Sequence, residues 1–164
     1  MTVQAGMGEW LHPSNKVCIE LVDITQLNKR WRQCYEYFDN NRKYWEHYYA
    51  LEDLYIEVFS GAVQLWLVGD EEGHWGCFLT KILEYPKAKV FQIMFAAANT
   101  DDGIDKLEAG ETYHEYMIAW AKRLGCTYSE IGFGRLGWKR VGERLGYECI
   151  RVSMRKSLEH IWRH

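Results

Sequence analysis

The most constraining feature of the sequence is the segment Val90–Ala97, which reads Val-Phe-Gln-Ile-Met-Phe-Ala-Ala and is apolar at every position but one. A strand with one face in water would alternate polar and apolar side chains, so this pattern favours a strand buried on both faces. The run is far shorter than the roughly 20 apolar residues that a membrane-spanning helix needs. The sequence therefore predicts a central strand in a sheet that is covered on both sides.

Three other segments have the periodicity of helices that could cover such a sheet. Apolar side chains recur every third or fourth residue over Gln26–Phe38, and again from Tyr44 to Val58, where Gly61 ends the pattern. A third helix is expected after Thr112, which has capping-box spacing to a glutamate three residues later, and Gly125 is suited to end it.

The remaining elements follow from alternation and turn residues. Strands are expected at Val17–Val22, Ala62–Val68, Trp75–Leu83, Ser129–Phe133 and Tyr147–Leu158, with a short helix at Gly137–Leu145. The predicted order is β-α-α-β-β-β-α-β-α-β. This order predicts one domain over residues 1–164, of the α/β (α+β) class, with a mixed central sheet of about six to seven strands flanked by helices.

Composition and charge narrow the class of partner. The chain of 164 residues is 48% apolar and 26% charged, as expected for a globular protein, and its net charge of −3 argues against nucleic acid or an anionic membrane. Residues 1–134 carry a net charge of −8 and residues 135–164 a net charge of +5. The basic part, which includes Arg140, Arg151 and Arg155, suits a ligand phosphate, an acidic protein partner, the acidic body of the same chain or, against the overall negative charge, a nucleic-acid backbone. The N-terminus has neither a basic segment nor an apolar run, which predicts a cytoplasmic protein.

Cysteine and histidine patterns do not predict a metal site. The five cysteines have no metal-knuckle spacing, and we expect reduced thiols that pack as small apolar side chains. The pair Glu111 and His114 is half of a di-iron helix motif, and such sites need that motif twice. His160 and His164 lie one turn apart in what we interpret as a solvated end of the chain.

The element order, and above all the segment from Gly137 to Glu148 (Gly-Trp-Lys-Arg-Val-Gly-Glu-Arg-Leu-Gly-Tyr-Glu) with the residues after it, resembles the GNAT superfamily of acyl-CoA-dependent N-acyltransferases. It looks like the family's late helix, its Leu-Gly-Phe-Glu turn and its final strand, with Tyr147 in place of the phenylalanine. The resemblance implies one GNAT-like domain. Residues 17–61 would form the N-terminal strand and helices, 62–97 the antiparallel strands, 98–158 the cofactor-side half and 159–164 the end of the chain.

The resemblance also implies an activity, the transfer of an acetyl or acyl group from acetyl-CoA or another acyl-CoA to an amine, without a metal. The candidate residues for the cofactor site that the resemblance implies are Phe95, Ala96, Ala97, Gly110 and Arg140. Small side chains on the fourth strand would let the pantetheine arm approach the backbone as an added strand does.

For catalysis, the resemblance implies a general base near the fourth or fifth strand and a tyrosine as general acid. Glu130 is the candidate base by position and Asp101 is the next. Gly142 occupies the position of the family's usual tyrosine, so Tyr147 is the candidate acid.

Departures from the family pattern keep a second function open. The segment 100–111 lacks the family's phosphate-binding spacing and carries five carboxylates. A catalytically inactive GNAT-fold protein would explain this, acting as a structural or partner-binding component. Aromatic residues, 15% of the chain, are concentrated between Trp31 and Trp66, where they suit either the core or an interface with another subunit. Size and C-terminal pattern resemble small GNAT-like phage proteins, which implies a virion-associated or host-interacting protein.

Overall fold

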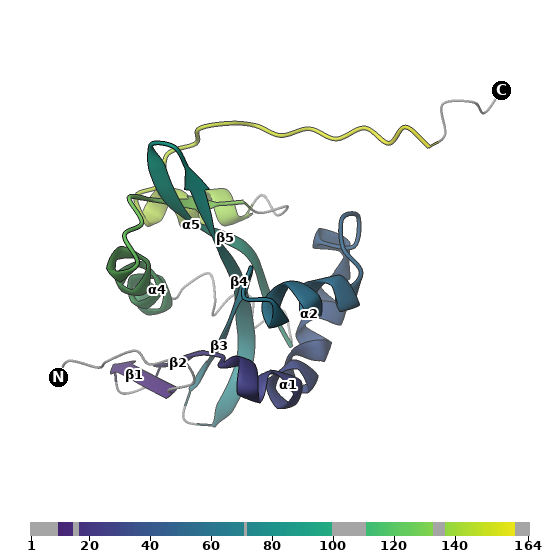
Figure 1. Ribbon diagram of the computed structural model, residues 1–164, viewed down its shortest axis with the longest axis vertical. Helices are drawn as coiled ribbons and strands as arrows, with labels where there is room; N and C mark the ends of the chain where they lie inside the picture. Colours follow the sequence, from purple (N-terminus) through teal and green to yellow (C-terminus); the bar gives the residue numbers. More distant parts are fainter. Residues whose placement is uncertain (1–9, 15–16, 71, 100–110, 133–136, 160–164) are drawn as a thin grey trace.

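The sheet is the frame on which the other elements are placed (Figure 1). The structure is a computed structural model, and it describes residues 10–14, 17–70, 72–99, 111–132 and 137–159. Within these residues the strands are β1 (Trp10–Ser14), β2 (Val17–Leu21), β3 (Gln64–Asp70), β4 (Gly73–Tyr85), β5 (Ala88–Ala98) and β6 (Tyr128–Ile131), side by side in that order. Neighbours are antiparallel except β5 and β6, which are parallel. The predicted α+β fold with a mixed central sheet is confirmed, and the six described strands are at the lower end of the predicted six to seven.

Helices cover both faces of this sheet, as Figure 1 shows. The longer helices are α1 (Leu27–Asn40), α2 (Leu51–Phe59), α4 (Glu111–Arg123) and α5 (Gly137–Arg144). Helices α1 and α2 pack on one face, and α4 and α5 contribute to the core on the other.

Strand β3 shows why helices must pack on both faces of the sheet. Leu65 and Leu67 belong to the core shared with α1 and α2, whereas Trp66 and Val68 belong to the core shared with α4. All four side chains are buried. Because successive side chains of a strand point to opposite faces, an uninterrupted apolar strand requires helices on both sides. The predicted central strand at Val90–Ala97 lies within β5 and is buried in the same way.

The second helix is shorter than the predicted segment from Tyr44 to Val58. A 3-10 turn at Arg42–Tyr44 and a linker precede α2, which begins at Leu51. The Asp53 carboxylate accepts a hydrogen bond from the backbone N–H of Ala50 (2.8 Å), and this cap fixes the first turn. Trp45 is buried in the linker and its indole N–H donates to the carbonyl of Phe38, so tertiary packing overrides the helical periodicity.

Strand β1 was not predicted. Trp10–Ser14 pairs with β2, and the register shifts between Leu11 and Ser14, on either side of Pro13. Proline lacks the N–H that a central strand needs, so it is tolerated at an edge such as this one.

The predicted last strand, Tyr147–Leu158, is wrong. Residues 148–159 are exposed and join no strand that the structure describes. Alternating side chains predict an extended backbone, but a strand also needs a neighbour, and the residue pattern does not say which one. The basic side chains Arg151 and Arg155 therefore do not lie on a face of the sheet.

Candidate functional site

The two parallel strands separate after a short pairing. The register runs from Val90 opposite Tyr128 to Ile93 opposite Ile131, and one further hydrogen bond joins the Gly132 N–H to the Ile93 carbonyl (3.1 Å). Strand β5 continues to Ala98, and over these last residues its described strand neighbour is β4 alone. An extended backbone with one neighbour is a place where a ligand with amide groups can add as a strand does.

A β-bulge lies where the strands separate. Leu79 of β4 is opposite Phe95 while Thr80 is opposite Ile93, so β5 has an additional residue, Met94. The bulge puts Met94 and Phe95 in the same core, next to α1 and α2, although they are neighbours in sequence. Bulges re-aim side chains and often lie beside active sites. No pattern in the sequence predicted this bulge, because apolar residues occupy both faces of β5.

Two asparagines hold the far end of β5. The side-chain amide of Asn41 is buried and donates to the carbonyls of Tyr37 (2.8 Å) and Ala98 (3.2 Å). The amide of Asn40 donates to the carbonyl of Asn99 (2.9 Å). The end of α1 is thereby attached to the end of β5, which keeps the predicted cofactor residues in place. Of those, Phe95 and Ala96 are half-buried and Ala97 is buried.

Tyr147 is the centre of a polar cluster on the opposite side of the sheet from α1 and α2. Its hydroxyl lies 2.6 Å from the Nε2 atom of His114 and 2.6 Å from the Oγ atom of Ser129. The phenol and imidazole rings are edge to face, with centroids 5.4 Å apart. Helix α4, strand β6 and the turn after α5 each supply one side chain, so the cluster joins three parts of the chain.

The local backbone explains how Tyr147 reaches this position. Gly146 has φ +88°, a left-handed conformation that ends α5 and that side chains disfavour. The N–H of Tyr147 then donates to the carbonyl of Gly142 (2.9 Å), which turns the chain back toward β6. Burial raises the pKa of Tyr147 above that of an ordinary tyrosine, and the hydrogen bond from Ser129 opposes this shift. The phenol therefore keeps its proton at neutral pH.

His114 and Ser129 were not predicted as partners of Tyr147. His114 had drawn attention only through its spacing to Glu111, which suggested half of a metal motif. Among the described residues, no group of three histidine, cysteine, aspartate or glutamate side chains is arranged to hold a metal ion. The five cysteines are free thiols, and Cys18, Cys34 and Cys77 are buried.

The other predicted site residues are spread over the molecule. Glu130 is half-buried on β6 opposite Gln92, and alternation directs it to the face away from Ser129. Arg140 is exposed on α5. Asp101 and Gly110 lie outside the described residues. Glu130 and the Tyr147 hydroxyl are thus both near β6 but on opposite faces of the sheet.

A second polar cluster lies on strands β2 and β4, away from the separation of β5 and β6. The carboxylate of Glu20 is buried, with the guanidinium of Arg30 at 3.1 Å and His74 Nε2 at 3.8 Å. Burial raises the pKa of Glu20, although Arg30 lowers it in part, and burial together with Arg30 lowers the pKa of His74. The ion pair of Glu20 with Arg30 joins α1 to the sheet, which is a structural role.

Comparisons with known proteins give matches at the level of structure. No protein-family model matches the sequence, and no curated protein matches it. An aminoglycoside acetyltransferase from an uncultured soil metagenomic sample has a TM-score of 0.65 at 13% identity, over 87% of this chain and 97% of its own. The chain has the GNAT acetyltransferase fold.

Two further structures agree with this fold. A GNAT family acetyltransferase from Staphylococcus aureus subsp. aureus has a TM-score of 0.58 at 16% identity, over 87% of this chain and 99% of its own. Glucosamine-6-phosphate N-acetyltransferase from Arabidopsis thaliana has a TM-score of 0.60 at 13% identity, with the same coverage. Identities this low support the GNAT fold and leave substrate and activity to be argued from the site. Among the described residues, no helix has the length and apolar character needed to cross a membrane.

Proposed function

We propose that this GNAT-fold chain is an N-acyltransferase that moves an acetyl or other acyl group from acyl-CoA to an amine. The observation that supports the proposal most is the separation of β5 from β6 after Ile93, beside the bulge at Met94. It leaves one edge of β5 without a described strand neighbour next to small side chains, as a pantetheine arm requires. Phe95, Ala96 and Ala97 are the residues we assign to that arm.

The fit of acyl-CoA can be judged from the side chains around this edge. Ala96 and Ala97 are short enough for a ligand backbone to approach β5 closely, and the amide of Asn41 keeps the strand end in position. Exposed Arg140 on α5 is assigned to the 3′-phosphate, for which a guanidinium offers several donors. Gly110 and Asp101 are kept as further candidates for pyrophosphate binding and base catalysis.

The chemistry needs a proton acceptor and a proton donor. Acyl-CoA supplies a thioester whose carbonyl carbon is attacked by the amine nitrogen, with release of the thiol. Glu130, which lies on the other face of the sheet from Tyr147, is assigned to accept the proton that the amine loses, and water molecules must carry that proton to it. Tyr147 is assigned to give a proton to the departing sulfur, because its buried phenol stays protonated at neutral pH. His114 and Ser129 orient the phenol through the two 2.6 Å hydrogen bonds.

Calorimetric titration of the purified chain with acetyl-CoA tests the proposal. Desulfo-CoA and adenosine 3′,5′-bisphosphate report the contributions of the thiol and of the nucleotide. We expect micromolar binding of acetyl-CoA that Arg140→Ala weakens several-fold. Lys139→Ala is the matched control, because Lys139 is an exposed neighbour whose ammonium pairs with Glu143 on the same helix (3.6 Å). No heat and no thermal stabilisation at millimolar ligand would refute the acyltransferase, since a bound ligand must stabilise the fold.

The alternative function is a catalytically inactive GNAT-fold protein that binds a partner, for example in a phage particle or at a host target. Exposed apolar and aromatic side chains on α1, the following turn and α2 favour it: Tyr35, Tyr48, Ile56 and Phe59. The carboxylates of segment 100–111 favour it too, because they would repel a pyrophosphate. Under this alternative, calorimetric titration with acetyl-CoA gives no heat although the chain is folded.

A further inference from the structure

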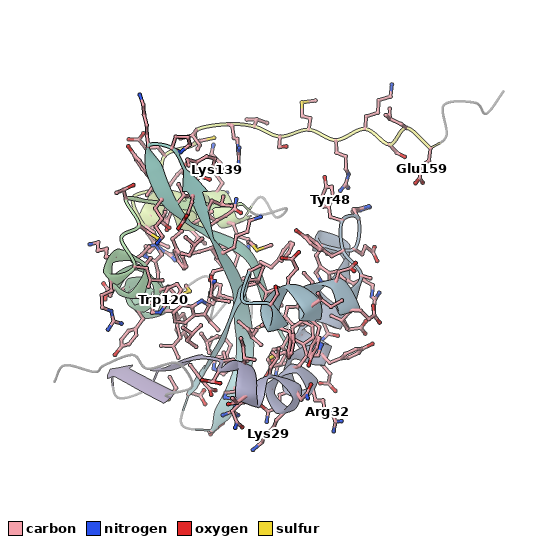
Figure 2. The ribbon with its side chains drawn as sticks, viewed as in Figure 1. Lys29, Arg32, Tyr48, Trp120, Lys139 and Glu159 are labelled. Atoms are coloured by element: carbon pink, nitrogen blue, oxygen red, sulfur yellow. The ribbon has the colours of Figure 1, made fainter. Side chains whose placement is uncertain are left out.

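The Tyr147 cluster contains a titratable ring to which the proposed chemistry gives only an orienting role. His114 is half-buried in the first turn of α4, and its Nε2 atom lies 2.6 Å from the Tyr147 hydroxyl. Figure 2, in which Trp120 marks α4 and Lys139 marks α5, shows the two helices on one side of the sheet, and Tyr147 follows the second of them. An imidazole in ordinary surroundings changes its charge between about pH 5 and pH 8. The proton on this ring therefore bears on what the phenol can do.

The number of protons in the cluster limits what the Tyr147 hydroxyl can donate. A phenol has one proton to give and an oxygen that can accept. Two partners lie at 2.6 Å, the Nε2 atom of His114 and the Oγ atom of Ser129. A neutral imidazole carries its proton on one nitrogen, so Nε2 is either a donor or an acceptor. The state of Nε2 decides where the phenol proton lies.

The two states of Nε2 give two arrangements of the cluster. When Nε2 has no proton it can only accept, so the Tyr147 hydroxyl donates to it and Ser129 donates to the phenol oxygen. The phenol proton is then held by His114 and is not directed at a ligand. When Nε2 is protonated, the ring donates to the phenol oxygen instead. The phenol proton is then available to Ser129 or to a stronger acceptor, such as a thiolate.

We infer that the neutral ring of His114 carries its proton on Nδ1 and holds the Tyr147 proton, and that protonation at Nε2 releases the Tyr147 proton for transfer. His114 is thus a positioning residue that acts through Tyr147. The step belongs to the proposed acyltransferase, on which the inference rests. The carbon–sulfur bond breaks with its electron pair on sulfur, the thiolate takes the phenol proton, and the phenolate takes the Nε2 proton. The ring regains a proton from water, which balances the proton that the amine loses.

Charged side chains on the surrounding elements lie in water or on the other face of the sheet. Glu130 on β6 lies on the face away from Ser129, and Glu20 on β2 faces α1, where it pairs with Arg30. Exposed charges, which water and salt screen, lie next to His114 on α4, on α5 and after it: Glu115, Lys139, Arg140, Glu143, Arg144 and Glu148. A change of charge on the ring therefore acts directly on Tyr147.

Nitrogen NMR of the purified full chain with labelled histidine tests the hydrogen bond without any substrate. We expect the neutral ring of His114 to carry its proton on Nδ1, and Nε2 to become protonated as the pH falls. The signal is assigned by its loss in His114→Gln. A neutral ring with its proton on Nε2 would leave the phenol proton free at every pH and would overturn the inference. This measurement does not depend on whether the chain binds acyl-CoA.

The pH dependence of acyl transfer gives the second test. With a weakly basic amine as acceptor, kcat should fall by about ten-fold per pH unit above the midpoint that NMR gives for His114. His114→Gln should abolish this fall, because an amide does not titrate, whereas a purely structural role of His114 would leave the fall in place. His47→Gln is the matched control, since His47 is exposed in the linker before α2 and should keep the wild-type profile.

The two measurements separate failure of the inference from failure of the proposed function. A fall in kcat that persists in His114→Gln would overturn the role of His114. Absence of acetyl-CoA binding would instead refute the acyltransferase, and the NMR result would still decide which partner holds the Tyr147 proton.

Discussion

The antiparallel half of the sheet and its β6 edge differ in how the backbone is used. Strands β2 to β4, and β5 up to Ile93, pair with neighbours on both sides, and their side chains fill the cores beneath the helices. Strand β6 is four residues long and, in the part of the chain that the structure describes, pairs with β5 alone; α5 and the exposed residues 148–159 come later in the chain. Both regions belong to one sheet, and they differ in how much of the strand backbone has a described strand neighbour.

This difference suggests that the antiparallel half determines the stability of the fold, whereas the β6 side is available for binding. The antiparallel half is closed, and a change there acts on folding as a whole. The β6 side has the end of β5 and the outer edge of β6, which lack a second strand neighbour among the described residues, and it has the Tyr147 cluster. Regions with few buried contacts open most easily, and binding elements are commonly drawn from them.

The largest expected effect comes from the closed half. Leu79 on β4 is fully buried in the core next to α1 and α2, so Leu79→Ala should lower the free energy of unfolding by about 2–5 kcal/mol. Val152→Ala, in the exposed residues 148–159, should change it by less than about 0.5 kcal/mol. Urea denaturation measures both. Similar losses for the two variants would remove the contrast between the regions.

The next effect concerns catalysis on the β6 side. Tyr147→Phe keeps the ring against His114 and removes the hydroxyl, so acyl transfer should slow by about 100-fold or more. That factor corresponds to about 2.7 kcal/mol of transition-state stabilisation, whereas stability should fall by only about 1 kcal/mol. Thiol release from acetyl-CoA with an accepted amine measures the rate. Tyr85→Phe, at an exposed tyrosine near the β4–β5 turn, is the control and should be neutral. An unchanged rate would exclude Tyr147 as the acid.

Most of the closed half could be predicted from the sequence, because its signals are local. Alternation, helical periodicity and turn residues located β2, β3, β4, β5 and α1 to within a few residues. The second helix was predicted too long, since the burial of Trp45 and the cap at Asp53 are decided by tertiary contacts. The bulge at Met94 could not be predicted from the sequence, because both faces of β5 are apolar and a shift in alternation is therefore not visible.

The β6 side was less predictable because its contacts join distant residues. Tyr147 was predicted from its place in a motif, but His114 and Ser129 come from other elements, and only the folded chain brings the three together. Glu130 was expected in the same site and lies on the other face of the sheet. The alternation of residues 147–158 is typical of a strand, yet the pattern carries no information on the neighbour that such a strand needs.

A smaller effect tests the link between the two regions. Asn41→Ala removes a buried donor to the carbonyls of Tyr37 and Ala98, and should cost about 1–3 kcal/mol because both acceptors stay buried. It should also weaken acyl-CoA binding, since the end of β5 loses its attachment to α1. Asn40→Ala is the matched control: its bond to the Asn99 carbonyl is exposed, so the cost should be under about 1 kcal/mol. Equal costs for the two variants would show that Asn41 does not hold the strand.

The smallest effect is a difference in pH dependence within the closed half. Burial raises the pKa of Glu20 above the ordinary value of 4.5, while Arg30 and Lys29 oppose the shift. The folded chain therefore holds this proton more tightly than the unfolded chain. Stability must fall as the pH rises from 4.5 through the raised pKa, and level off above it.

Glu20→Gln removes this titration, so the wild type should lose stability relative to the variant as the pH rises through that window. His74 titrates in both proteins: its pKa lies below 6.5, so its contribution is present above pH 6.5 and is lost as the pH falls, the opposite sign. Denaturation curves for both proteins from pH 4 to pH 8 separate the two groups. If the wild type instead gains on the variant as the pH rises, the attraction of Arg30 exceeds the penalty of burial, and the buried ion pair stabilises the closed half.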